Sequence, residues 1–229
     1  MPEEEPRTNL VECPLVYEDE LGSVETTCRS DGHCLVFDLR GRTFRGRSFN
    51  LLDVDGSQME DLPRDRFPVD ERGDLVARFT MTLPVAVVGS DDPTAGLVLV
   101  FAYRDANAID GTLTVDGVQY RADAGWVEDV LIQIQRQLPA GVFIACCLSC
   151  RWSHYDPLGN NSFGDLACVV DLPDAATASA KGDVFRLWRG PLEYTQETWH
   201  CPRFRLLQPG EWAYKDWGLV DISPPTAEP

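Results

Sequence analysis

The sequence has few basic residues and few histidines for its size. Its 229 residues include 20 Lys and Arg against 37 Asp and Glu, which gives a formal net charge of −17, and only 3 His. A surplus of negative charge repels the phosphates of nucleic acids and the headgroups of anionic lipids. We therefore expect neither nucleic acid nor membrane as a partner. A protein partner bound through charge would be a basic one.

Long apolar runs are also missing. The longest, residues 141–150, has the length of a strand and falls short of the about 20 residues that a helix needs to cross a bilayer. The chain begins Met-Pro-Glu-Glu-Glu, where a secretory signal carries positive charge before an apolar stretch. These absences predict a cytoplasmic protein. Disulfides are rare in that compartment, so clustered cysteines indicate metal ligands or redox groups.

The short motifs that mark common enzyme sites are absent. There is no phosphate-binding G-x-x-x-x-G-K-[ST], no G-x-G-x-x-G after a strand, no H-E-x-x-H and no G-x-S-x-G. With only His33, His154 and His200, a metallohydrolase site built on several histidines is hard to assemble. The sequence therefore favours a protein that is not an enzyme.

The apolar pattern that is present is mostly that of β-strands. Apolar and polar residues alternate over residues 75–88, and residues 97–103 are nearly all apolar, as in a central strand. The pair Asp116-Gly117 lies between two alternating segments. It predicts a hairpin, because these residues accept the positive φ angles of a tight turn.

One segment has helical periodicity. A helix is predicted over residues 126–138, whose apolar face carries Val127, Val130, Leu131, Ile134 and Leu138. Buried strands are predicted over residues 142–150 and 166–172, and a surface loop over residues 174–182.

Arginines alternate with aromatic residues in residues 40–49. Interleaved arginine and aromatic side chains can bind nucleic acid or an anion. Alternation along a strand pair equally places the arginines in solvent and the phenylalanines in the core, and the negative net charge favours this second interpretation. The residues concerned are Arg40, Arg42, Arg45, Arg47, Phe44 and Phe49.

Four of the eight cysteines have a spacing typical of a zinc site. Cys147 and Cys150 form a C-x-x-C pair, and Cys168 and Cys201 follow. Two cysteines separated by two residues can point both sulfurs at one ion, and Zn²⁺ takes four such ligands in a tetrahedron. We therefore predict structural Zn²⁺ on these four residues. The competing interpretation is that they are small buried apolar residues.

Several alternatives stay open at this site. Cys146 adjoins Cys147, and on a strand only one of the two can face the metal. His200 could replace Cys201 as the fourth ligand. If one metal position were open, Glu197 and His200 could serve a zinc-dependent hydrolase. A further possibility is a thiol-based redox switch that releases zinc on oxidation.

The cysteine motifs resemble those of an uncharacterised, mainly actinobacterial family of unknown function. The central signature, C-x-x-C-x-x-S-x-Y-x-P-x-G-x-x-x-F-G-x-L-x-C, runs from Cys147 to Cys168, and the downstream motif E-x-x-x-C-P-x-F runs from Glu197 to Phe204. An upstream match begins at Phe44. The resemblance spans residues 15–205 and supports the grouping of the four cysteines, but it implies no reaction.

Taken together, the sequence predicts an α+β fold. We expect a β-rich, mainly antiparallel sheet or sandwich with one or two packed helices and a Cys-rich, metal-stabilised lobe. Residues 1–8 and 223–229 are predicted to be disordered tails, residues 9–139 the β-rich region, and residues 140–222 the lobe on the same core. The function that this suggests is an acidic, zinc-binding protein-interaction module, such as an immunity or inhibitor protein against a cationic toxin.

Overall fold

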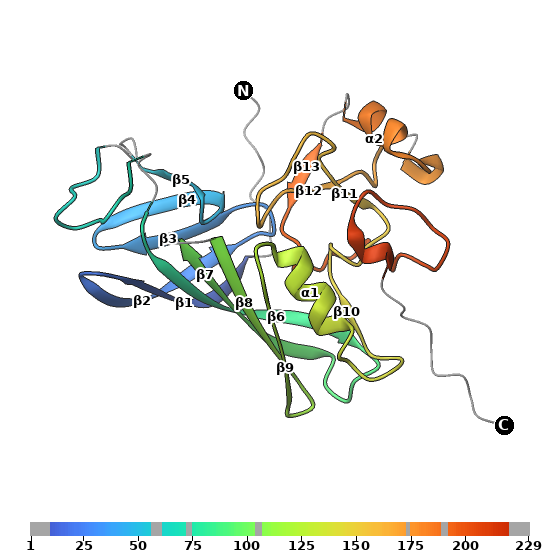
Figure 1. Ribbon diagram of the computed structural model, residues 1–229, viewed down its shortest axis with the longest axis horizontal. Coiled ribbons are helices and arrows are strands. Elements are labelled where there is room, and N and C mark those ends of the chain that lie inside the picture. The colour runs from blue at the N-terminus through green and yellow to red at the C-terminus, as the bar shows by residue number, and fades with distance from the viewer. Residues whose placement is uncertain are drawn as a thin grey trace.

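One large antiparallel sheet organises the chain. A computed structural model describes residues 10–55, 61–71, 75–103, 107–172, 175–188 and 192–219. Within these residues the sheet has ten strands in the order β5-β4-β3-β2-β1-β6-β7-β8-β9, with β10 beside the far end of β6 (Figure 1). A second sheet of three short strands, β11-β12-β13, belongs to the C-terminal lobe. The expectation of a β-rich, antiparallel fold with one or two helices is confirmed.

The elements follow one another along the chain with few long connections. They are β1 (Val11–Asp19), β2 (Gly22–Ser30), β3 (Leu35–Leu39), β4 (Arg42–Ser48), β5 (Leu51–Val54), β6 (Arg78–Val88), β7 (Thr94–Tyr103), β8 (Asn107–Val115), β9 (Val118–Ala124), α1 (Val127–Gln135), β10 (Phe143–Ala145), β11 (Ser153–Tyr155), β12 (Leu166–Cys168), η2 (Ala175–Thr177), α2 (Lys181–Leu187), β13 (Glu193–Thr195) and η3 (Asp216–Leu219). None of the described helices is both long and apolar enough to span a membrane.

The core is a continuous set of aromatic rings on one face of the sheet. The ring of Phe79 lies 4.5 Å from that of Phe49 and 5.3 Å from that of Tyr17, and Phe101 lies 5.5 Å from Phe163 of the lobe. All five side chains are buried. The alternation that predicts the strands therefore also fills the core. As expected, Phe44 and Phe49 face inward and Arg45 is exposed, whereas the other arginines of this segment are half-buried: Arg40, Arg42 and Arg47.

The predicted hairpin is present. Asp116 and Gly117 have φ angles of 49° and 79°, the positive values that a tight two-residue turn requires. They join β8 to β9. A second turn of this kind joins β3 to β4 at Arg40-Gly41, where Arg40 has φ 48°. The Arg40 guanidinium is held there by the buried Asp19 carboxylate at 2.5 Å.

Helix α1 is shorter than the predicted 126–138 and ends at Gln135. Beyond that residue the N–H of Gln137 bonds the carbonyl of Ile134, three residues back, which tightens the chain into a turn before Pro139. The helix packs on β8 and β9 and also contacts η3 (Figure 1). Two glutamine amides, one on the helix and one in the turn after it, reach the edge strand: Gln133 of α1 donates to the Asp123 carbonyl at 3.5 Å, and Gln137 of the turn donates to the Arg121 carbonyl at 2.9 Å.

The predicted strand over residues 142–150 is wrong for most of its length. Only β10, residues 143–145, pairs with the sheet, and the chain then turns. The cause is the Ser149 hydroxyl, which accepts the Cys146 N–H at 3.0 Å and lies 2.7 Å from the Ile144 carbonyl oxygen, to which it donates. A side chain that bonds the local backbone in this way replaces the next pairs of the ladder.

Three further sequence expectations need correction or lie outside the structure. The strand predicted over residues 166–172 stops at Cys168, where a turn begins. The loop predicted over residues 174–182 contains η2 and the start of α2. Both predicted tails, residues 1–8 and 223–229, lie outside the described residues.

Two glycines of the sheet provide a matched test of how closely α1 packs. A Cβ at Gly111 of β8 would lie 2.3 Å from Cγ1 of Val130, whereas a Cβ at Gly96 of β7 would meet nothing within 4 Å. We expect Gly111→Ala to lower the free energy of unfolding by about 1–3 kcal/mol, because the helix must shift. Gly96→Ala should be neutral or slightly stabilising, since glycine weakens a strand. Urea unfolding measures both, and equal effects would contradict this packing.

Candidate functional site

The C-terminal lobe contains two turns that each begin at a cysteine. In the first, the N–H of Cys150 donates to the carbonyl of Cys147 at 3.1 Å. In the second, the N–H of Phe204 donates to the carbonyl of Cys201 at 3.0 Å. Both turns thus close over three residues. Each presents a cysteine at its start, and the first presents another at its end.

The two turns are connected through the intervening backbone. The N–H of Cys147 donates to the carbonyl of Trp199 at 2.6 Å, and the N–H of Leu148 donates to the carbonyl of Glu197 at 2.9 Å. The chain around residues 197–201 therefore runs beside the first turn. The bridge between Cys150 and Leu206 holds the other side.

Cys168 enters the same region from the small sheet. It ends β12, where it pairs with Ser153 of β11 on one side and with Glu193 of β13 on the other. Burial raises the pKa of its thiol, and the nearby thiols of Cys150 and Cys201 raise it further. The hydroxyl of its strand partner Ser153 lies 3.1 Å from the Cys150 carbonyl oxygen, so Cys168 lies beside the first cysteine turn.

Cys147 belongs to the same neighbourhood and is more deeply buried, with 7% of its surface exposed. Burial raises the pKa of its thiol well above the ordinary value, and the thiols of Cys150 and Cys201 add to this. The Thr195 hydroxyl lies 3.7 Å from the Cys147 sulfur. Cys146 is fully buried beside it, with its N–H on the Ser149 hydroxyl.

The four predicted zinc ligands lie in the same lobe, but their thiols are not arranged as a metal site. Among the residues that the structure describes, no group of three or more His, Cys, Asp or Glu is arranged so that it could hold a metal ion. All eight cysteines are described, and all are free thiols. The donor chemistry therefore suits Zn²⁺, whereas the sulfur positions would have to draw together to bind it.

Positive charge accompanies the thiols. The ammonium of Lys215 donates to the Cys150 carbonyl and, at 2.6 Å, to the Ser153 hydroxyl. Burial lowers the pKa of Lys215 to about 8, while the thiols of Cys150 and Cys147 favour its charged form. Sequence reasoning missed this residue, although it is one of only two lysines in the chain. A cation here would partly offset the charge of clustered thiolates.

The two residues proposed for a hydrolase lie in different environments. Glu197 is fully buried: its carboxylate accepts the Gly164 N–H at 2.7 Å and the Tyr155 hydroxyl at 3.2 Å. His200 is exposed, and its Nδ1 lies 2.9 Å from the Ala145 carbonyl oxygen. In this geometry Glu197 ties together two segments of the lobe and has no face in solvent.

Comparison with known families assigns the chain. The sequence model of a family of unknown function, DUF6304, matches residues 12–153, more than half of the chain. The chain belongs to this family. The family expected from the cysteine motifs is thereby confirmed, although the DUF6304 match includes only Cys147 and Cys150 of the four predicted ligands. No curated protein and no solved structure matches the chain.

The buried carboxyl of Glu197 predicts a specific pH dependence of stability. Burial raises its pKa in the folded chain to about 7, above the ordinary 4.5. The folded chain therefore holds a proton that the unfolded chain releases between these values, so Glu197 lowers stability as the pH rises through this window. Glu197→Gln cannot ionise. The variant should gain stability relative to the wild type across the window, by up to about 3 kcal/mol.

Urea unfolding on both sides of this window measures the difference. Taking the difference between the two proteins removes the contribution of Glu128, whose pKa burial also raises to about 7. A difference between wild type and Glu197→Gln that does not change with pH would show that folding leaves the pKa of this carboxyl at its ordinary value.

Proposed function

We propose that this DUF6304 protein is a non-catalytic cytoplasmic module whose C-terminal lobe is stabilised by a structural Zn²⁺ ion on Cys147, Cys150, Cys168 and Cys201. The observation that carries the proposal is the pair of cysteine turns with Cys168 of β12 beside them. Four thiolates fill the tetrahedral shell of zinc, which leaves no position for substrate. The metal would then serve stability and not a reaction.

The small size of the lobe supports a need for such a metal. Its three strands have three residues each. The lobe contributes Phe163, Leu166 and Trp217 to the main core, and among the described residues its separate apolar cluster has Val169, Ala175 and Leu187 as buried members. The part of the lobe around this small cluster gains little folding energy from apolar burial, and small units of this kind commonly depend on a metal or on disulfides. The free thiols leave the metal as the candidate.

Cysteine replacement tests the zinc proposal. We expect the purified protein to carry about one zinc ion per chain. Cys147→Ser and Cys201→Ser should lose the metal and several kcal/mol of stability, because metal affinity supplies folding energy. Cys34→Ser is the matched control, since this half-buried thiol lies in the turn between β2 and β3 of the large sheet. Elemental analysis and thermal melting provide the two readouts.

The same experiment separates the proposal from its alternatives. Full zinc content in Cys201→Ser, or a metal-free wild type, would contradict the four-thiol site. Zinc on three thiols with an exchangeable water would favour a hydrolase. Reversible zinc loss with peroxide would favour a redox switch.

The partner we propose is a basic protein. The support is the net charge of −17, which favours a cationic surface and disfavours nucleic acid. An immunity or inhibitor role against a cationic toxin has this chemistry. Binding of such a partner should weaken strongly as the salt concentration rises, because exposed charges are screened.

A further inference from the structure

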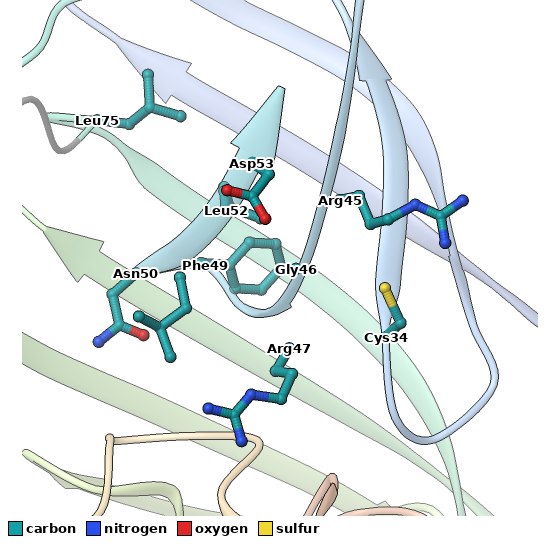
Figure 2. Close-up of a pocket in the computed structure, with 10 residues that line it drawn as sticks. Cys34, Arg45, Gly46, Arg47, Phe49, Asn50, Leu52, Asp53 and Leu75 are labelled. Atoms are coloured by element: carbon teal, nitrogen blue, oxygen red, sulfur yellow. The ribbon is translucent and has the colours of Figure 1, made fainter. Parts of the chain in front are cut away.

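A cleft of about 490 Å³ opens where β4 and β5 meet. The register of these strands shifts between Gly46 and Ser48, which makes a bulge with Arg47 as the extra residue. Figure 2 shows Cys34 and Arg45 together at one end of the cleft and Asn50 at the other. The cleft therefore lies at an interruption of the sheet, where backbone pairing does not fill the space.

A second hollow of about 200 Å³ adjoins the first. It is lined by Leu10, Arg29, Asp31, Cys34, Val36 and Arg45. Cys34 and Arg45 also line the larger cleft. Arg45 therefore stands where the two hollows meet, and Arg29 faces the same region from β2.

The strand register explains why these two arginines share a face. Arg29 pairs with Val36, and Val36 pairs with Arg45. Directly paired residues point to the same side of a sheet, and strands lie about 4.8 Å apart, so the two arginine backbones are about 10 Å apart. Only Val36 stands between them. Two arginine side chains of ordinary length can close on one anion across this gap.

In the described part of the chain, no ion pair neutralises the charge of Arg29 or of Arg45. Within the described residues, Arg29 and Arg45 form no salt bridge, although the chain has 37 acidic residues. Asp53 lies opposite Arg45 on β5 and also lines the larger cleft, and Asp31 lines the smaller hollow. The Asp31 carboxylate, however, accepts the N–H groups of His33 and Cys34 at 2.9 and 2.8 Å.

Arg47 already contacts residues of the lobe, so we do not assign it to the anion. Its guanidinium lies 4.3 Å from the centre of the Tyr194 ring and 3.4 Å from the Asp165 carboxylate. It therefore forms a fixed wall that joins the cleft to the lobe. The apolar surface of the cleft comes from residues such as Leu51, which is 41% exposed.

We propose that Arg45 and Arg29 bind the oxyanion of a small organic phosphate or carboxylate, and that its apolar part lies in the larger cleft against Leu51. The guanidinium fork matches both oxyanions in a bidentate arrangement. A bare phosphate would fill little of the 490 Å³, which points to an organic body. The net charge of −17 repels long polyanions and so favours a small ligand.

Titration with phenyl phosphate, followed by isothermal calorimetry or by protein NMR shifts, tests this site on the full chain. Phenyl phosphate should bind more tightly than inorganic phosphate. Phenol, which is uncharged, should show no saturable binding. Benzoate in place of phenyl phosphate shows which oxyanion the site prefers. Arg45→Ala should weaken the binding of phenyl phosphate by about tenfold or more. Arg45→Lys should weaken it by less, because lysine keeps the charge but lacks the guanidinium fork.

Arg78→Ala is the matched control. Arg78 lies on β6 with half of its side chain exposed, outside both hollows, and should bind phenyl phosphate as the wild type does. Thermal melting checks that each variant folds. The proposal is overturned if phenyl phosphate shows no saturable binding, if Arg45→Ala binds it like the wild type, or if Arg78→Ala weakens it as much.

Discussion

A very close approach between the C-terminal lobe and the large sheet is made by Gly32, in the turn after β2, and the ring of Trp199, and the hydrogen bonds beside it depend on this approach. A Cβ on Gly32 would lie 2.4 Å from that ring, so only glycine allows the approach. Its φ of 85° also belongs to the left-handed region that glycine accepts. The Gly32 carbonyl accepts the N–H of Gln196 at 2.7 Å, and the Ser30 hydroxyl donates to the Gln196 side chain at 2.7 Å. The lobe is thereby fixed to the large sheet through residues 195–199.

This attachment continues to the cysteines and to the arginine cleft. The carbonyls of residues 197 and 199 accept the N–H groups of the first cysteine turn. Because the sheet holds residues 195–199, it positions the proposed zinc ligands indirectly. On the other side, a Cβ on Gly164 would lie 2.4 Å from the Arg47 carbonyl oxygen. The bulge of β4 and the Glu197 network therefore share one packed interface. A displacement of the lobe would therefore shift Arg47, which forms one wall of the cleft.

Local patterns in the sequence predict the parts of this fold that depend on neighbours along the chain. The Asp116-Gly117 hairpin and α1 are of this kind, because a turn's φ angles and a helix face are set within a few residues. The structure of residues 142–150 cannot be predicted in this way, because an apolar run suits a strand and a buried turn equally. Here the hydrogen bonds of the Ser149 side chain decide for the turn. Nothing periodic in the sequence links Gly32 to Trp199. The cysteine spacing groups Cys147 and Cys150, but their approach to Cys168 and Cys201 depends on the packing of the lobe on the sheet.

The glutamine amides of α1 and of the turn after it reach the carbonyls of β9, which has a consequence for this outermost strand. The free edge of a sheet is a template on which another chain can add a strand, and this is how many proteins aggregate. Here Gln137 and Gln133 occupy the carbonyls of Arg121 and Asp123. At the opposite border β5 has only four residues beside a bulge, which offers little length for pairing. The two amides thus occupy acceptors that an added strand would need, so pairing of another chain with β9 would first have to break these hydrogen bonds.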